Sequence, residues 1–409
     1  MITAVMFVGL FFAYALLSRR LAETPITAPI LFTGAGMLVS PSWAHIVGAG
    51  VTASVFLRVA EIGLVLLLFT DASRTELAVL RSISTLPGRL LSTGMLLTIV
   101  LGTLVARLVF PRLSLWEAGI LGTILAPTDA GLGQVVVSSP RVPMRIRQAL
   151  NVEAGLNDGL SVPFMLFFMV LAAAKTEGGP AALLQFIGEQ LGLGIGAGIA
   201  IGLAGGWLLR VASSRRWMGE GFQQIAVVAI PLFCMLFAEM IDASMFIASF
   251  VAGLAVQIPF KEASKQSVEF AEEWGQIFNL AVFFLFGMVV VRDWAQFTPS
   301  CWVYAILSLT IIRMLPVALA LIGTGFGRPS VIFMGWFGPR GLASIVLGMV
   351  YLEQELHLPG EPKIRAVVMA TVALSIFLHG LSALPGIRIY SHYVAGLESS
   401  APERQQLAT

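Results

Sequence analysis

Charge is scarce in this sequence. Of the 409 residues only 12% are Asp, Glu, Lys or Arg, whereas 57% are hydrophobic, and the formal net charge is +2. Soluble globular domains carry about a quarter charged residues. The composition therefore argues against a soluble domain. It also provides no strongly basic surface, so we expect no nucleic acid among the partners.

Cysteine and the common cofactor motifs are scarce as well. The two cysteines, Cys234 and Cys301, stand too far apart in the sequence to suggest a metal or redox motif. The sequence contains no phosphate-binding loop and no zinc motif, which argues against an ATP-driven pump. We therefore expect neither a cofactor nor an enzymatic activity.

Long apolar blocks are abundant. A helix needs about 20 consecutive apolar residues to cross a membrane, and several runs, such as 90–109 and 191–209, approach that length. The blocks predict an all-α integral membrane protein with about thirteen transmembrane helices. The predicted spans are 2–17, 26–40, 57–70, 90–109, 115–137, 148–173, 182–210, 222–240, 243–258, 273–291, 301–325, 330–352 and 364–387.

Short loops between these spans leave no room for a separate soluble domain. We expect a single transmembrane domain over residues 1–390, followed by a short cytoplasmic tail at 391–409. Spans four to six and eleven to thirteen are expected to form a core bundle. The remaining spans are expected to provide a dimer interface.

Lysine and arginine are unevenly distributed between the loops. Sixteen of them follow odd-numbered spans or lie in the tail, and seven follow even-numbered spans. Short cytoplasmic loops carry the excess of basic residues. We therefore expect an outward N-terminus and a cytoplasmic C-terminus, with the chain surrounded by lipid in a bacterial inner (plasma) membrane.

Polar and charged groups inside spans mark the candidate functional region, because such groups are costly within a membrane. Two acidic spans and two basic spans suggest internal pairing. The residues are Thr128 and Asp129 in the fifth span, Glu153, Asn157 and Asp158 in the sixth, Arg313 in the eleventh and Arg340 in the twelfth.

The fifth and twelfth spans share an interruption. Each breaks an apolar run with proline and glycine around a charge, at 127–131 and at 339–341. Proline removes a helical hydrogen bond, and paired broken helices in two repeats are typical of a transporter's ion site. We therefore predict inverted repeats with two discontinuous helices that cross near the membrane midplane. Asp129 would suit converging helix N-termini and Arg340 converging C-termini, although simple structural pairing is an equal alternative.

Asp158 differs from the other charged residues. Glu153 is expected to pair with Arg313, which leaves Asp158 near the midplane with no assigned basic partner. Burial of an unpaired carboxylate favours the bound proton, and a metal cation would satisfy the same oxygens. The pattern therefore predicts a site at which a cation and a proton compete.

Three other readings remain open at this point. An intramembrane aspartyl hydrolase could use Asp129 and Asp158 as its catalytic pair, but the basic residues and the matched broken spans would then have no role. A sodium- or proton-coupled symporter of a small organic solute would need a roomier polar cavity. A passive channel would need a continuous polar pathway, whereas the polar groups here gather at one depth.

The Thr128-Asp129 and Asn157-Asp158 pairs together resemble the signature of the sodium/proton antiporters of the cation:proton antiporter superfamily. The similarity extends to the segments GPRGLAS at 338–344 and SIFLHG at 375–380. It implies exchange of a monovalent cation, with sodium favoured, for protons. It also implies that Asp158 binds the ion with Asp129 and Thr128 nearby, that Glu153 and Arg313 form a bridge, and that the protein is a homodimer.

In that family an Asn before the ion-binding Asp accompanies electroneutral exchange, so Asn157 implies one proton per cation. Two positions depart from the family pattern. Ala154 stands where relatives often have a coordinating Ser, and Ser161 is a candidate replacement for that hydroxyl. Asp71 stands about where relatives often have an acidic residue, commonly Glu, at the inner end of the third span, and is either a further candidate ligand or a solvated loop residue.

Overall fold

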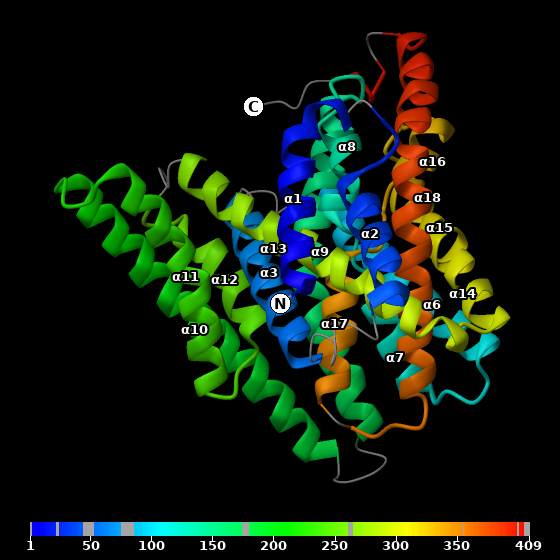
Figure 1. The fold of residues 1–409 in the computed structure, drawn as a ribbon, viewed down its shortest axis with the longest axis horizontal. Coiled ribbons are helices and arrows are strands. Elements are labelled where there is room, and N and C mark those ends of the chain that lie inside the picture. Colours follow the sequence, from blue (N-terminus) through cyan, green and yellow to red (C-terminus); the bar gives the residue numbers. More distant parts are fainter. Residues whose placement is uncertain are drawn as a thin grey trace.

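A computed structural model describes residues 2–21, 24–43, 53–74, 86–173, 180–260, 265–354, 356–398 and 401–404. Within these ranges the regular secondary structure is entirely helical (Figure 1), which confirms the predicted all-α class. Three of the basic residues counted for the orientation, Arg81, Lys175 and Lys261, lie outside the described residues.

The helices begin and end as follows: α1 (Ile2–Leu21), α2 (Ala28–Trp43), α3 (Ala53–Arg74), α5 (Leu86–Arg89), the π-helical turn η1 (Leu90–Gly94), α6 (Met95–Val109), α7 (Leu115–Ile124), α8 (Ala130–Val137), α9 (Met144–Ala173), α10 (Pro180–Ser214), α11 (Glu220–Met240), α12 (Met245–Val256), α13 (Lys265–Arg292), the 3₁₀ turn η2 (Trp294–Gln296), α14 (Pro299–Leu309), α15 (Ile311–Ala320), α16 (Arg328–Trp336), α17 (Leu342–Glu353) and α18 (Glu361–Ala395).

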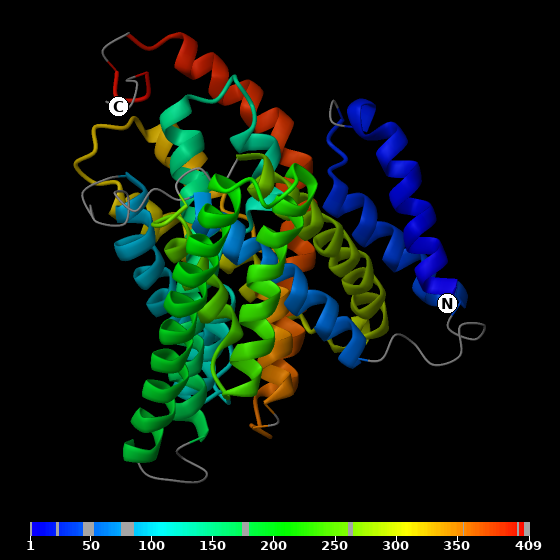
Figure 2. The same ribbon diagram turned by 90° about the vertical axis from the view of Figure 1, so that its left-hand side faces the viewer.

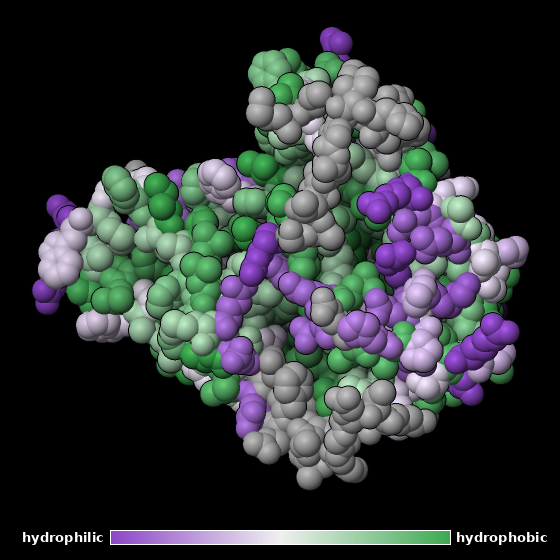
Figure 3. Space-filling model, turned by 60° about the horizontal axis from the view of Figure 1, so that its bottom comes forward, coloured by the Kyte–Doolittle hydropathy of each residue, from purple (hydrophilic) through white to green (hydrophobic). Residues whose placement is uncertain are grey.

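The structure does not confirm the predicted number of thirteen membrane crossings. Among the described residues, eight helical segments are long and apolar enough to cross a membrane, and four shorter apolar helices accompany them. Two of the shorter helices, α7 and α17, are halves of the interrupted spans. Polar residues gather on the end of the molecule where α18 begins, and hydrophobic residues border them (Figure 3).

Several predicted boundaries were wrong in detail. The eleventh span is two helices, α14 and α15, because the backbone at Thr310 leaves the helical region with φ −110° and ψ −94°. The fourth span begins with the π-helical turn η1 instead of a regular helix. α9 and α18 extend beyond the apolar blocks, because hydropathy marks the membrane-buried part of a helix and not its hydrogen-bonded ends.

Part of the segment 391–409, which is expected to be a short cytoplasmic tail, packs on the helices. α18 continues to Ala395. Glu403 is then buried, where its Oε1 accepts hydrogen bonds from the Gly327 N–H at 2.9 Å and the Ser330 hydroxyl at 2.7 Å. Its carboxylate therefore satisfies backbone and side-chain donors at the N-terminus of α16.

The helices pack in two groups. In one group, which we call the facing bundle, α13 lies against α2 and α3, and α12 lies against α10 and α3. In the other, which we call the core bundle, α7 packs on α6 and α9, α8 packs on α9 and α18, and α14 packs on α18. Figure 2 shows α1 and α2 on the opposite flank of the molecule from α10–α12.

Both interrupted spans are discontinuous, as predicted. α7 and α8 are separated at 125–129, and α16 and α17 at 337–341. The two pairs run in opposite directions, since α7 and α17 lie at one end of the molecule and α8 and α16 at the other (Figure 1). The Asp129 N–H donates to the Pro339 carbonyl at 2.8 Å, so the two breaks are in direct contact.

Candidate functional site

Asp129 lies where two helix N-termini converge. Its Oδ1 accepts from the Leu132 N–H at 3.0 Å and caps α8, and its Oδ2 accepts from the Leu342 N–H at 2.5 Å at the start of α17. Helix N-termini present unpaired N–H groups and partial positive charge, both of which favour a carboxylate. Asp129 therefore holds the two half-helices together.

Arg340 lies at the C-terminal end of α7. Its Nη1 donates to the carbonyls of Ala126 and, at 2.9 Å, of Pro127, and the side chain is fully buried. Its own N–H donates to the Ser375 hydroxyl on α18 at 2.7 Å. The guanidinium thus neutralises the partial negative charge of a helix C-terminus and supplies donors to carbonyls that have no helical partner.

Asn157 fixes the extended segment that precedes α8. Its Oδ1 accepts from the Thr128 N–H at 3.2 Å, and its Nδ2 donates to the Thr128 hydroxyl at 2.8 Å. Both groups are buried, so neither can exchange this partner for bulk water. Asn157 therefore acts on Thr128, and its amide turns toward the break.

Glu153 and Arg313 form a buried ion pair. Arg313 Nη1 and Nη2 donate to the two carboxylate oxygens at 2.5 and 2.9 Å, and each side chain is 2% exposed. Parallel hydrogen bonds of this kind give an arginine–carboxylate pair its fixed geometry. The pair joins α9 to α15, directly after the interruption at Thr310.

Asp158 lies at the middle of α9, which is about 45 Å long at the helical rise of about 1.5 Å per residue. It is buried, and its Oδ1 has no hydrogen-bond partner among the described residues. The charges that act on it are those of Asp129 and Asp71, both acidic. Asp71 packs on Gly155, where an added Cβ would lie 2.9 Å from the Asp71 Cβ.

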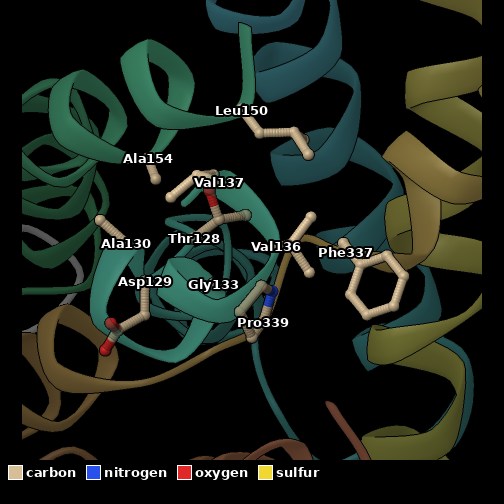
Figure 4. A pocket seen from close by; sticks show the side chains of 10 residues that line it. All are labelled: Thr128, Asp129, Ala130, Gly133, Val136, Val137, Leu150, Ala154, Phe337 and Pro339. Atoms are coloured by element: carbon tan, nitrogen blue, oxygen red, sulfur yellow. The ribbon is translucent and has the colours of Figure 1, made fainter. Parts of the chain in front are cut away.

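A small pocket borders the break between α7 and α8 (Figure 4). It is lined by Thr128, Asp129, Ala130, Gly133, Val136, Val137, Leu150, Ala154, Phe337 and Pro339. Ala154, which stands where relatives often have Ser, thus lies on the same pocket as Thr128. In Figure 4 the Asp129 carboxylate turns away from the neighbouring side chains, in keeping with its bonds to helix N-termini.

Most of the predicted site residues lie at or beside the two breaks. Ser161 is the exception, because its hydroxyl does not point into the pocket. The Ser161 hydroxyl donates to the Asp158 carbonyl of its own helix at 2.7 Å, and Ser161 does not line the pocket. The sequence reasoning missed Asn279, on α13 of the facing bundle, which reaches Gly131 beside Asp129. The sequence feature that could have identified Asn279 is a single amide side chain within the apolar run FNLAVFF.

Comparison with known proteins adds independent information. Residues 7–386 match the family described as "Sodium/hydrogen exchanger, transmembrane". The chain is 26% identical over 309 residues to a Na(+)/H(+) antiporter of Schizosaccharomyces pombe, a match that covers 67% of this chain and 64% of that protein. It is 24% identical over 394 residues to the K(+)/H(+) antiporter NhaP of Alkalimonas amylolytica, covering 94% of this chain and 66% of that one.

The fold is shared with a solved structure. The sodium proton antiporter MjNhaP1 from Methanocaldococcus jannaschii superposes with a TM-score of 0.73 at 17% identity, over 97% of this chain and 98% of that one. The curated relatives are longer: the chain spans 64% of the S. pombe protein and 33% of Na(+)/H(+) antiporter 2 of Zygosaccharomyces rouxii.

Proposed function

The chain belongs to the sodium/hydrogen exchanger family of integral membrane proteins, and on that premise we propose that it exchanges a monovalent cation for protons. It is a transporter and not an enzyme, and the ions are substrates that need no cofactor. We assign the exchange to the crossing of the two broken helices, with sodium as the favoured cation.

The state of Asp158 is the observation that carries this proposal. Its Oδ1 is buried at the middle of a long helix and has no hydrogen-bond donor among the described residues. The nearby basic groups are engaged elsewhere, Arg313 with Glu153 and Arg340 with the end of α7. A carboxylate in such a place is stable only with a proton or a cation bound.

Exchange follows if the two ligands use the same oxygens. A protonated Asp158 is neutral, and loss of the proton creates the negative charge that a dehydrated cation requires. Because one carboxylate carries one negative charge, it binds either the cation or the proton and not both at once. The proposal is therefore electroneutral exchange of one cation for one proton, in keeping with the neutral Asn157 beside Asp158.

The other predicted residues are proposed to support this site. Thr128 and Asp129 lie in the break, and Asp71 packs on Gly155 one turn from Asp158. These three residues are proposed to complete the cation's surroundings. Ser161 remains a candidate through the lone pairs of its hydroxyl oxygen. Glu153, Arg313 and Arg340 are proposed to keep the core bundle rigid and its charge balanced, so that Asp158 alone titrates with transport.

Of the three other readings, neither the hydrolase nor the symporter gains support from the structure. A hydrolase dyad would need two free carboxyl groups, whereas both oxygens of Asp129 accept hydrogen bonds from backbone N–H groups. A symporter of an organic solute would need a cavity lined by several polar groups, and apolar side chains dominate the pocket beside the break.

We also propose how the protein lies in its membrane. The basic residues favour an outward N-terminus and a cytoplasmic C-terminus, and we propose a bacterial plasma membrane as the location. A homodimer is proposed through the helices outside the core bundle. α1 presents apolar side chains such as Val5 and Phe12, 68% and 65% exposed, which lipid or a second copy would cover.

Reconstitution tests the proposal. Liposomes that contain the protein and a pH-sensitive dye receive a proton gradient and then sodium, lithium or potassium. Wild type should release protons on addition of cation, and Asp158→Asn should not. Asp293→Asn, which removes a carboxylate that pairs with Arg365 at 3.6 Å after α13, is the matched control and should exchange normally.

Two results would contradict the proposal: no cation-driven proton movement in wild type, or full activity in Asp158→Asn. The stoichiometry is tested by clamping the membrane potential with valinomycin and potassium. The rate of electroneutral exchange should not change with the imposed potential.

A further inference from the structure

Asn279 is a polar side chain without a role in the site described so far. It lies at the middle of α13, as Asp158 lies at the middle of α9. The residue is 7% exposed, and its Oδ1 has no hydrogen-bond partner among the described residues. A buried amide oxygen left without a partner costs about 1–3 kcal/mol, so its retention calls for a ligand.

The Asn279 side chain reaches across from the facing bundle to the core bundle. Its Nδ2 lies 3.0 Å from the position that a Cβ at Gly131 would take, and Asp129 Oδ1 lies 3.1 Å from that same position. The amide nitrogen and the carboxylate oxygen therefore both border the space that a side chain at residue 131 would fill. The amide nitrogen is the atom beside Gly131, and the unpartnered Oδ1 is free for another group.

A second acidic contact comes from the same side. Asp71 on α3 packs on Gly155 of α9, one turn from Asp158. α3 and α13 lie against each other in the facing bundle, where Gly63 of α3 meets Phe278 and the backbone of Asn279. The facing bundle thus presents a carboxylate and an amide to the core bundle, on the two segments that flank the Asp158 site.

We propose that Asn279 supplies its amide oxygen to the transported cation from the facing bundle. This inference rests on the exchange proposed above and deepens it. A dehydrated monovalent cation needs several oxygen ligands, and neutral carbonyl oxygens serve as well as carboxylates. An amide oxygen does not take up a proton near neutral pH. Asn279 therefore stabilises the bound cation without stabilising the bound proton, and it favours cation over proton at Asp158.

The test separates cation affinity from proton affinity. Exchange is measured in liposomes over a range of sodium concentrations at several pH values, for wild type, Asn279→Leu and Asn279→Ser. Leu keeps the volume of Asn and removes the oxygen, whereas Ser keeps an oxygen. Thr33→Val is the matched control, because Thr33 is fully buried, its Oγ1 is unpartnered too, and it packs on α13 at Gly287.

Asn279→Leu should raise the apparent KM for sodium about tenfold, the ratio that corresponds to the loss of one good polar contact. The maximal rate and the inhibition constant for protons should stay at the wild-type value, Asn279→Ser should recover part of the affinity, and Thr33→Val should behave as wild type. Calorimetric titration of sodium into the detergent-purified protein should show the same loss.

An unchanged KM in Asn279→Leu would overturn the inference. So would a fall in rate that is equal at all sodium concentrations, or an equal effect of Thr33→Val, because either indicates a packing role. If Asn279→Leu does not fold, Asn279→Asp decides: it adds a proton acceptor and should strengthen inhibition by protons, and an unchanged pH dependence refutes the proposal. Absence of exchange in wild type would contradict the proposed function as well as this inference. The other outcomes would contradict this inference alone.

Discussion

The Asp129 carboxylate accepts a hydrogen bond from the Leu342 N–H at 2.5 Å, and this contact joins the two broken helices of the fold. The second carboxylate oxygen accepts from Leu132 in the residue's own half-helix. Asp129 is thus satisfied by protein donors, whereas Oδ1 of Asp158 is not. The two aspartates at the crossing therefore differ in their bonding: Asp129 holds the two half-helices together, and Asp158 is the one proposed to exchange a proton for the ion.

The first prediction separates these two tasks. Asp129→Asn turns an amide N–H group toward Leu132 or Leu342, which are themselves donors, so it should lower the free energy of unfolding by about 2 kcal/mol and abolish exchange. Asp158→Asn removes a buried carboxylate whose Oδ1 lacks a donor. It should abolish exchange without loss of thermal stability. Thermal unfolding in detergent, beside the liposome assay, distinguishes the two, and equal destabilisation by both variants would contradict the assignment.

The second prediction concerns the pair of Glu153 and Arg313, each 2% exposed. Removing one partner leaves an uncompensated buried charge, which costs about 3–5 kcal/mol. Glu153→Leu and Arg313→Met should each strongly reduce thermal stability and the amount of folded protein. The double variant Glu153→Leu with Arg313→Met should recover much of the stability, because an apolar pair of similar volume avoids the cost of burying charge.

A double-mutant cycle built from these three variants gives the coupling energy between the two side chains. If the double variant is as unstable as the sum of the singles, the pair is not coupled and the reading of its role is wrong. Exchange by a stable double variant would show that the pair supports the fold and takes no part in ion binding.

The third prediction tests the close approach of the breaks. A Cβ added at Gly341 would lie 2.0 Å from Asp129 Oδ2, which two half-helices hold in place. Gly341→Ala should therefore separate α8 from α17 and abolish exchange in the liposome assay. Gly34→Ala is the control, because a Cβ there meets no heavy atom within 4 Å. Normal exchange by Gly341→Ala would show that the crossing tolerates the separation.

Much of this site could be anticipated from the sequence, because strong local physics dictates it. Pro127 and Pro339 cannot donate a helical hydrogen bond, and each stands with a glycine beside a charge, a combination that favours a break where proline alone, as at Pro163 in α9, does not cause one. Once a break exists, its helix ends attract charges of known sign, which accounts for the positions of Asp129 and Arg340. The burial of Glu153 requires a cation nearby, and Arg313 was one of two available.

Other features depend on packing that no sequence pattern records. The contact of Asn157 with Thr128 requires the register between α8 and α9, because the residues are on separate helices. The direction of Asn279 depends on how the facing bundle lies against the core bundle. Nothing in the apolar run around Thr310 distinguishes the interruption there from a continuous helix.

The last prediction concerns the hydroxyl that relatives often carry in the sixth span. Ala154 lines the pocket with Thr128, so Ala154→Ser would add an oxygen close to the proposed cation site. The Ser161 hydroxyl, in contrast, donates to the carbonyl of Asp158 within its own helix. Ala154→Ser should therefore lower the apparent KM for sodium several-fold, and Ser161→Ala should change it less than twofold.

Exchange at a series of sodium concentrations measures both effects, and Ala154→Val serves as the control for added volume. Val adds volume at residue 154 without adding an oxygen. It should therefore raise KM or slow exchange by filling the pocket beside Thr128. A rise in KM for Ser161→Ala with no change for Ala154→Ser would reverse the assignment. The ion would then take its hydroxyl ligand from the turn after Asp158 and not from the turn before it.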